Sequence, residues 1–270
     1  MEPRSSESIA SPRSPKNDGS DTSNEQPPTV TQHVLDGRSG QQLLADSSKP
    51  SVTQVSEATV ADPEIVTMLE PYRAVVAERA NRIVGRLAEP LTRGSYDDHT
   101  SSLGFFLADA MRRETKASMG SEPDMCFTNR GGIRTDLPAG EVTEGTLIEV
   151  MPFDNGIVVF YMTGKELEPI VRRITERGDP ASGLSYTRRA NLSEDITIAG
   201  EFIDAKRVYS ICTNDYLFEG GGGYQFEGAQ NALYTGVLLR DAMIREFELA
   251  SERQEAIRPA TDQRVKVVTE

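Results

Sequence analysis

The chain reads MCFTNRGGIR from Met125 to Arg134, an apolar run of three residues and a threonine followed by a loop with two consecutive glycines. The run at 125–128 predicts a buried strand, because short apolar runs that end at a turn signal are typical of central strands. Glycines allow backbone paths that a side chain would forbid. The loop gathers the amide of Asn129 and the guanidinium of Arg134 just beyond the strand end, a common place for binding oxyanions. Taken alone, this short motif favours a tight turn with solvated arginines.

A second glycine segment follows another predicted strand. Residues 207–212 read RVYSIC and lead through NDYLFE at 214–219 into four glycines, Gly220 to Gly223. Both unusual backbone segments therefore come directly after strands. We expect 129–134, Phe153 and 220–224 to meet on one face of the domain, although some 90 residues separate the two loops.

The other periodicities predict a mixture of helices and strands. Asp62 before Pro63 is a helix start, since Asp caps the free amides and Pro suits the first turn. Apolar residues then recur along one stripe, which we expect to pack against the domain. We expect helices over 63–80, 102–113, 165–176 and 233–249, strands over 82–87, 125–128, 156–162 and 264–268, and a hairpin of 202–203 with 207–212. This pattern, which contains no internal repeat, predicts a single α+β domain.

Composition changes along the chain. Residues 1–62 hold 5 basic and 9 acidic residues among many Ser, Pro, Gln and Thr, with hardly any aromatic side chains. Such a segment buries too little apolar surface to offset its chain entropy, so we predict a disordered tail at 1–62. Residues 63–270 are enough for one sizeable core, and we assign them to one domain.

Charge and hydropathy exclude several classes of function. The net charge of −13 argues against broad binding to nucleic acid or to an anionic membrane surface. No apolar run exceeds about eight residues, whereas a membrane-spanning helix needs about 20. The first residues lack the basic and apolar regions of a secretory signal peptide.

Two cysteines, Cys126 and Cys212, lie in apolar contexts and are expected to be buried thiols.

Four motifs occur in a specific order. They are NRGGIR at 129–134, PFDN at 152–155, TGKEL at 163–167 and GGGGY at 220–224. In this order they resemble the C-terminal domain of the 5'-nucleotidase family, with its pattern N-x-G-G-I-R, P-F-x-N, T-G-x-x-L and G-G-D-G-[FY]. The resemblance covers about 63–250 and implies a single layered α/β domain of that type.

The resemblance also implies a substrate site for a nucleoside or nucleotide. Asn129 would bond the nucleoside, and Arg134 would contact the phosphate. Phe153 and Tyr224 would stack on the two faces of the base, an arrangement that holds any flat base with little demand on its identity. Glu227 is our assignment for the carboxylate that binds the ribose hydroxyls. The complete expected set is Asn129, Gly132, Arg134, Phe153, Asn155, Tyr224 and Glu227.

The sequence departs from the family pattern in two places. The family has an arginine near the start of the helix before the first motif, where this chain has acidic residues and His99, which we interpret as a polar surface histidine. Gly222 stands where the family has Asp, so an acceptor that braces the loop is lost. Arg93 and Arg130 are nearby cations that would compensate.

The larger departure concerns the metal centre. Family members carry two catalytic metals in an N-terminal calcineurin-like domain with D-x-H, G-D and G-N-H-[DE] motifs, none of which occurs here. A two-metal centre needs several His and Asp ligands, and this chain has two histidines. We therefore expect no catalytic residue, metal ligand or bound cofactor in this chain, with Zn or Mn held only by a partner metallophosphatase domain.

Three hypotheses remain open at this point. The first is a substrate-binding domain that acts in nucleotide phosphoester hydrolysis with a separate metallophosphatase chain, which a split gene or a truncated sequence would also resemble. The second is a nucleotide-binding or interaction module that has lost hydrolysis, and the third is a folded remnant without ligand or partner. The compartment is also open, because the missing signal peptide favours the cytoplasm while the family is often periplasmic or extracellular.

Overall fold

The computed structural model describes residues 56, 59–94, 99–261 and 263–268. The disordered tail predicted for 1–62 falls almost wholly outside these residues and stays a prediction. The described part from Ala61 onward forms one compact unit of mixed helices and sheets, which confirms the predicted α+β class. Among the described residues, no helix combines the length and the apolar character that crossing a bilayer requires.

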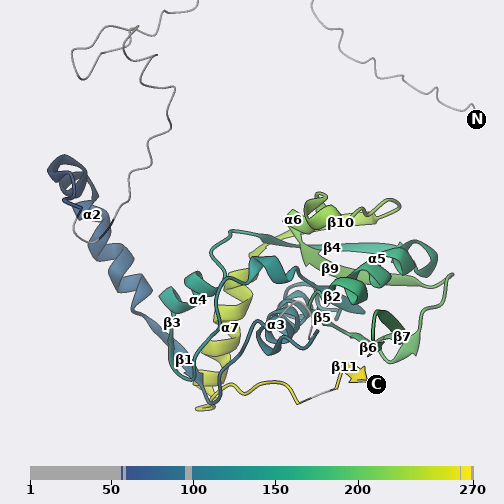
Figure 1. Ribbon diagram of the computed structural model, residues 1–270. Coiled ribbons are helices and arrows are strands. Elements are labelled where there is room, and N and C mark those ends of the chain that lie inside the picture. Colours follow the sequence, from purple (N-terminus) through teal and green to yellow (C-terminus); the bar gives the residue numbers. More distant parts are fainter. Residues whose placement is uncertain (1–55, 57–58, 95–98, 262, 269–270) are drawn as a thin grey trace, which may run out of the picture. The chain divides into compact units, whose positions relative to one another are not determined.

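A five-stranded sheet forms the centre of this unit (Figure 1). In spatial order the strands are β10 (Gln230–Leu238), β4 (Gly156–Thr163), β9 (Val208–Asn214), β2 (Met125–Phe127) and β5 (Ala181–Ser182). Strands β9 and β2 are parallel, and the other neighbouring strands are antiparallel. The predicted strands at 125–128 and 156–162 are confirmed within one residue at each end.

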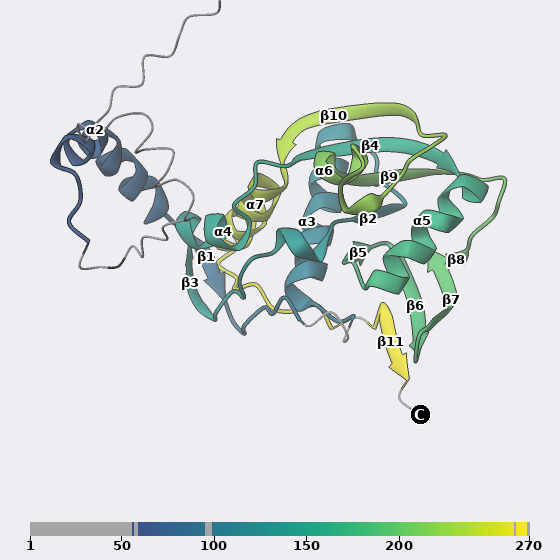
Figure 2. The same ribbon diagram turned by 45° about the horizontal axis from the view of Figure 1, so that its top comes forward.

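Helices cover both faces of this sheet (Figures 1 and 2). Helices α3 (Ser102–Met119) and α7 (Leu239–Glu252) pack with Ile157 and Val159 in one apolar cluster. Helix α5 (Gly164–Arg177) packs with Val158 and Phe160 in the other. Successive side chains of a strand point to opposite faces, so the continuous apolar run of β4 supplies both clusters.

Smaller elements complete the unit. A four-stranded sheet contains β11 (Val265–Val268), β6 (Leu184–Arg189), β7 (Leu192–Ile198) and β8 (Glu201–Phe202), in that spatial order. Strand β1 (Ile83–Leu87) pairs antiparallel with β3 (Gly140–Thr143), which leads into α4 (Glu144–Val150). Short helical turns follow the two central strands: η1 (Arg130–Gly132), α6 (Asp215–Phe218) and η2 (Gly221–Gly223).

Capping residues fix the ends of the two helices that flank the sheet. The Ser101 hydroxyl accepts a hydrogen bond from the backbone of Gly104 and begins α3. Thr163 begins α5 in a reciprocal capping box, with the Glu166 carboxylate accepting a bond from the backbone of Thr163 at 3.0 Å. Helix α5 ends at Gly178, which has the left-handed conformation that favours glycine. The sequence signals predicted the start of both helices and the end of α5, but α3 continues six residues beyond its predicted end at 113 and stops at the left-handed Gly120.

Two predicted elements differ from the structure. The helix expected over 233–249 is a strand up to Leu238 and a helix only from Leu239, because 230–238 pairs along β4. The hairpin expected between 202–203 and 207–212 is wrong: β8 pairs with β7, and β9 lies between β4 and β2. In both cases pairing with distant strands decides the structure, and local periodicity carries no information about that pairing.

Helix α2 (Pro63–Ala80) begins where expected, with the Asp62 carboxylate accepting from the backbone of Glu64 at 2.8 Å. The prediction that its apolar stripe packs against the domain is wrong. None of its residues is buried, and Leu69 and Tyr72 are 42% and 66% exposed. The helix instead contacts the domain at its C-terminal end, where Arg79 bonds the carboxylate of Glu144.

Glu144 anchors this junction. Its side chain is 3% exposed and accepts hydrogen bonds from the guanidinium groups of Arg79 and Arg82. Burial alone would raise the pKa of Glu144, but the hydrogen bonds from the two arginines outweigh it and hold the pKa below its ordinary value. A buried carboxylate with two cationic partners therefore joins α2 to α4.

We predict that Glu144→Gln lowers the free energy of unfolding by about 1–2 kcal/mol at pH 7, because the buried acceptor loses its charge. Since the folded-state pKa is lowered, the contribution is complete above the ordinary value of 4.5 and is lost as pH falls through the folded-state pKa. Urea unfolding at pH 7 and at pH 3 measures both. Glu149→Gln, an exposed position on the same helix, is the control and should change little. An equal loss at both pH values would contradict the prediction.

Candidate functional site

The two glycine loops leave the same edge of the central sheet. Strands β2 and β9 are parallel neighbours, so the segments that follow Phe127 and Asn214 begin side by side. The buried Asn214 side chain connects them, because its amide nitrogen donates to the Thr128 hydroxyl at 2.9 Å and to Oδ1 of Asn129 at 3.2 Å. The two segments therefore begin at one junction, as the prediction for the two loops requires.

The next residue, Asp215, joins the PFDN motif at 152–155 to this edge. The Asp215 carboxylate accepts from the side chain of Asn155 at 2.9 Å and from the backbone of Gly156 at 2.9 Å. Asn214 and Asp215 thus hold Asn129 and Asn155 near each other across three segments of the chain. Neither was among the expected site residues. Their place in the sequence, between a predicted strand and a glycine run, is the signal that could have identified this role.

Arg134 and Phe153 lie on the exposed side of this junction. The Arg134 guanidinium donates to the carbonyl of Gly131 at 3.2 Å and lies 5.9 Å from the centre of the Phe153 ring, within the range of a cation–π contact. Phe153 is 44% exposed and Arg134 is exposed. The backbone carbonyl of Arg134 accepts from Arg93 at 2.9 Å, so this predicted compensating cation reaches the same loop. A cation and an aromatic face are therefore both accessible here.

The first glycine pair differs from its expected role. Gly131 and Gly132 form the turn η1 without positive φ, and a Cβ at either position would come no closer than 3.5 Å to its neighbours. The backbone therefore does not require glycine at these two positions. The expected contact residue Gly132 is buried, with the side chain of Asn129 among its nearest neighbours.

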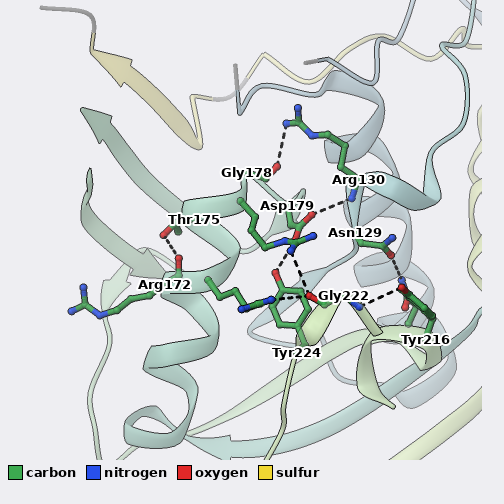
Figure 3. Close-up of polar contacts among 12 residues, drawn as sticks. Asn129, Arg130, Arg172, Thr175, Gly178, Asp179, Tyr216, Gly222 and Tyr224 are labelled. Atoms are coloured by element: carbon green, nitrogen blue, oxygen red, sulfur yellow. Dashed lines mark hydrogen bonds and ion pairs between the residues drawn. The ribbon is translucent and has the colours of Figure 1, made fainter. Parts of the chain in front are cut away.

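The second glycine loop is held by arginines of α5. The carbonyl of Gly222 accepts from Arg173 at 2.9 Å and from Arg177 at 3.4 Å (Figure 3). Gly222 has a φ of 62°, in the left-handed region that favours glycine. The position where the family has Asp is therefore braced here through its backbone oxygen, by two cations from another element.

Asp179 also supports this loop, through hydrogen bonds. Its carboxylate accepts from the Tyr224 hydroxyl at 2.8 Å, from Arg177 at 3.0 Å and from the backbone of Arg130 at 3.2 Å. The carboxylate is almost fully buried. It therefore connects the two glycine loops through hydrogen bonds to Arg130 and Tyr224 (Figure 3).

Tyr224 does not occupy the position expected of it. The residue is 1% exposed, and its ring packs against Phe127, Phe226 and the guanidinium of Arg173. Burial, together with the neighbouring Asp179, raises the pKa of the Tyr224 hydroxyl. A ring enclosed in this way offers no face to a base, so its position does not support the predicted stacking role.

Glu227, the expected ribose contact, is exposed on another surface. Together with Tyr224 it borders a hollow of about 580 Å³ along α5, whose walls include Arg173 and Glu166. The five other expected residues, 129, 132, 134, 153 and 155, do not line this hollow. The structure therefore brings Asn129, Arg134, Phe153 and Asn155 to one junction and leaves Glu227 apart from it.

His99 lies inside the domain, which corrects its interpretation as a surface histidine. It is 4% exposed, and its Nδ1 lies 3.1 Å from the hydroxyl of Tyr186. Burial raises the pKa of Tyr186 to about 12.

Across the residues that the structure describes, no group of three His, Cys, Asp or Glu side chains is placed to hold a metal ion. These residues do not fit a metal centre, and we derive no metal-dependent step from them.

Comparison with known proteins gives consistent results. The family model described as "5'-nucleotidase, C-terminal domain" matches residues 82–228. The trifunctional nucleotide phosphoesterase protein YfkN of Bacillus subtilis is 28% identical over 67% of this chain and 14% of its own length. Protein UshA of Escherichia coli is 27% identical over 68% of this chain and 35% of its own length. The chain thus spans about a third or less of these two relatives.

Solved structures share the fold. A 5'-nucleotidase precursor from Thermus thermophilus superposes with a TM-score of 0.62 at 22% identity, covering 79% of this chain and 45% of that one. The NAD nucleotidase of Haemophilus influenzae gives a TM-score of 0.60 at 18% identity, covering 86% of this chain and 46% of that one. At these identities the likeness concerns the fold alone.

We predict that Asp179→Ala lowers the free energy of unfolding by about 2–3 kcal/mol, because three donors lose a buried charged acceptor. Tyr224→Phe removes one of the three bonds and should cost about 1 kcal/mol. Urea unfolding measures both values, and amide exchange at 220–224 should accelerate in the Asp179→Ala variant. Glu176→Ala, an exposed position on α5, is the control. Unchanged protection of the glycine loop would contradict the assigned role of Asp179.

Proposed function

Because this chain belongs to the family of 5'-nucleotidase C-terminal domains, we propose that it binds nucleosides and nucleotides and acts in their phosphoester hydrolysis together with a metallophosphatase domain supplied by another chain. The observation that carries this proposal is the convergence of Asn129, Arg134, Phe153 and Asn155 on one sheet edge through Asn214 and Asp215. The name of YfkN as a nucleotide phosphoesterase supports the substrate class.

The two asparagines offer complementary polar groups. Oδ1 of Asn129 accepts from Asn214, so the amide nitrogen of Asn129 remains a donor toward a ligand. The amide nitrogen of Asn155 donates to Asp215, so its carbonyl oxygen remains an acceptor. A nucleoside carries both acceptors and donors on its base and ribose. The pair therefore suits a polar, planar ligand better than a purely apolar one.

Arg134 and Phe153 supply the other two kinds of contact. A guanidinium binds a phosphate through two parallel hydrogen bonds, and the exposed Arg134 has this geometry available. The half-exposed Phe153 ring offers a flat apolar surface on which a base stacks. In this proposal the chain binds and orients the nucleotide, and the metals that activate water and balance charge belong to the other domain.

A second candidate function is a nucleotide-binding or interaction module without hydrolysis. Two observations favour it. The helix before the first motif lacks the family's arginine, and Gly222 replaces the family's Asp in the second glycine loop. Binding of nucleotides is common to both candidates, so the activity measurement separates them.

We predict that Arg134→Gln weakens AMP more than adenosine, because only AMP carries the phosphate. The dissociation constant for AMP should rise about 5- to 10-fold, the equivalent of about 1–1.4 kcal/mol for one exposed charged contact, and that for adenosine less than 2-fold. Isothermal titration calorimetry measures both ligands. Arg172→Gln, an exposed arginine on α5, is the control. Equal losses for the two ligands would show that Arg134 is not a phosphate contact.

We further predict that the purified chain does not hydrolyse AMP, cyclic nucleotides or UDP-sugars, with or without added Mn²⁺ or Zn²⁺. Two divalent ions need about six to eight protein donors in fixed geometry. Phosphate release measures turnover, and adding a metallophosphatase domain of the same family in trans should restore part of it. Restoration supports the first candidate, whereas nucleotide binding without restoration supports the second. Metal-dependent turnover by the chain alone, lost in Arg134→Gln, would contradict both.

A further inference from the structure

Helix α2 carries six large apolar side chains that are between 42% and 67% exposed. Their spacing of three or four residues places them on one side of the helix. This stripe consists of Ile65, Met68, Leu69, Tyr72, Val75 and Val76. A contiguous apolar surface of this kind normally marks a contact with a partner. We propose that the stripe pairs antiparallel with the α2 stripe of a second copy of the chain.

The helix needs a partner for its own stability. Pro71 lies inside it, where it removes a backbone hydrogen bond and crowds the preceding turn, at a cost of about 3 kcal/mol. Most helices in proteins are stabilised by packing of an apolar face, yet no residue of α2 is buried. The bond from Arg79 to Glu144 holds the C-terminal end. A cover over the stripe would supply the packing that the other turns lack.

The stripe is symmetric about Tyr72, the residue nearest to the middle of the helix. In an antiparallel pair with Tyr72 at the two-fold axis, Met68 lies opposite Val76 of the second copy, and Leu69 lies opposite Val75. Each contact then occurs twice, once on each side of the axis. The same surface therefore serves both copies, which is the condition for a closed dimer.

Arg79 continues the stripe and determines the direction of the pair. It lies seven residues after Tyr72, and its side chain is 66% exposed although it bonds Glu144. With the axis at Tyr72, Arg79 lies beside the first turn of the other helix, where Asp62 and Glu64 are acidic. A parallel pair would instead place Arg79 against its own copy, and like charges in that position repel each other. Charge complementarity therefore favours a second copy in the antiparallel direction.

The stripe is large enough for a reversible dimer. Covering a half-exposed apolar side chain of this size removes roughly 60–100 Å² from water. Six such side chains from each copy together give on the order of 1,000 Å², the size at which specific interfaces begin. An interface at this lower limit is expected to dissociate in the micromolar range.

Sedimentation velocity of the full chain at increasing concentration tests the dimer. Wild type should change from monomer to dimer between about 5 and 500 µM, because dimer formation follows mass action. Tyr72→Glu and Tyr72→Lys each place two like charges at the axis and should weaken association about 10-fold or more. An equal mixture of these two variants should dimerise again, since each glutamate then lies opposite a lysine.

Ala74→Glu and Ala74→Lys are the matched controls, because Ala74 is an exposed residue on the opposite side of α2. Both should associate as wild type does. Thermal unfolding of every variant checks that the fold is retained. Since the Tyr72 side chain is 66% exposed, its replacement should leave the domain folded.

Cysteine cross-linking measures the direction of the pair. Tyr72→Cys should form a disulfide-linked dimer on mild oxidation with diamide, which takes up the two hydrogen atoms of the thiols. Met68→Cys and Val76→Cys should each fail to link with themselves and should link with each other when mixed. A parallel pair would link each variant with itself. The native Cys126 and Cys212 are buried and give the background.

The outcomes separate this inference from the proposed function. A wild-type chain that stays monomeric overturns it, including the cases in which residues 1–55 or a metallophosphatase domain cover the stripe. Dimerisation that Tyr72→Glu leaves unchanged overturns it as well, and so does a mixture of the two charged variants that stays monomeric. Each measurement is made without nucleotide, so the dimer can be wrong while nucleotide binding stands, or the reverse.

Discussion

The parallel pairing of β2 with β9 is the constraint on which the rest of the site depends. Parallel neighbours end at the same edge of a sheet, so two loops that are 85 residues apart at Asn129 and Asn214 begin side by side. The buried side chain of Asn214 then bonds across the gap between the strands. An antiparallel pair would direct the two loops to opposite ends of the sheet and leave no common junction.

The sequence predicted those features that local chemistry determines. Helix α5 has its capping threonine and closing glycine in the sequence, and the strand at 156–162 is a continuous apolar run between polar segments. Order and spacing of the four motifs indicated the family, which the comparisons confirm. The predictions of α5 and of the strand at 156–162 needed no knowledge of distant contacts. The family prediction rested on a pattern of motifs in which such contacts are already implied.

The features that were missed depend on contacts between distant segments. The strand at 230–238 exists because it pairs along β4, although its sequence also suits a helix. A polar His99 in a segment of acids indicated surface, but Tyr186 from another element covers it. Tyr216 and Tyr224 both lie beside the glycine run, but Tyr224 is 1% exposed and Tyr216 50%. Phe127 and Asp179, which lie far from the loop in the sequence, contact Tyr224, so the sequence pattern could not tell which tyrosine is buried.

The burial of both cysteines has a practical consequence. Cys126 and Cys212 are register partners on β2 and β9, and both are fully buried, as expected. Burial raises the pKa of the Cys126 thiol, which further lowers the reactive thiolate fraction. A maleimide reagent would therefore react preferentially with a single cysteine engineered on the surface. A fluorophore or spin label attached in this way at an exposed residue of the glycine loop, such as Gln225, would report loop motion without removal of the native thiols.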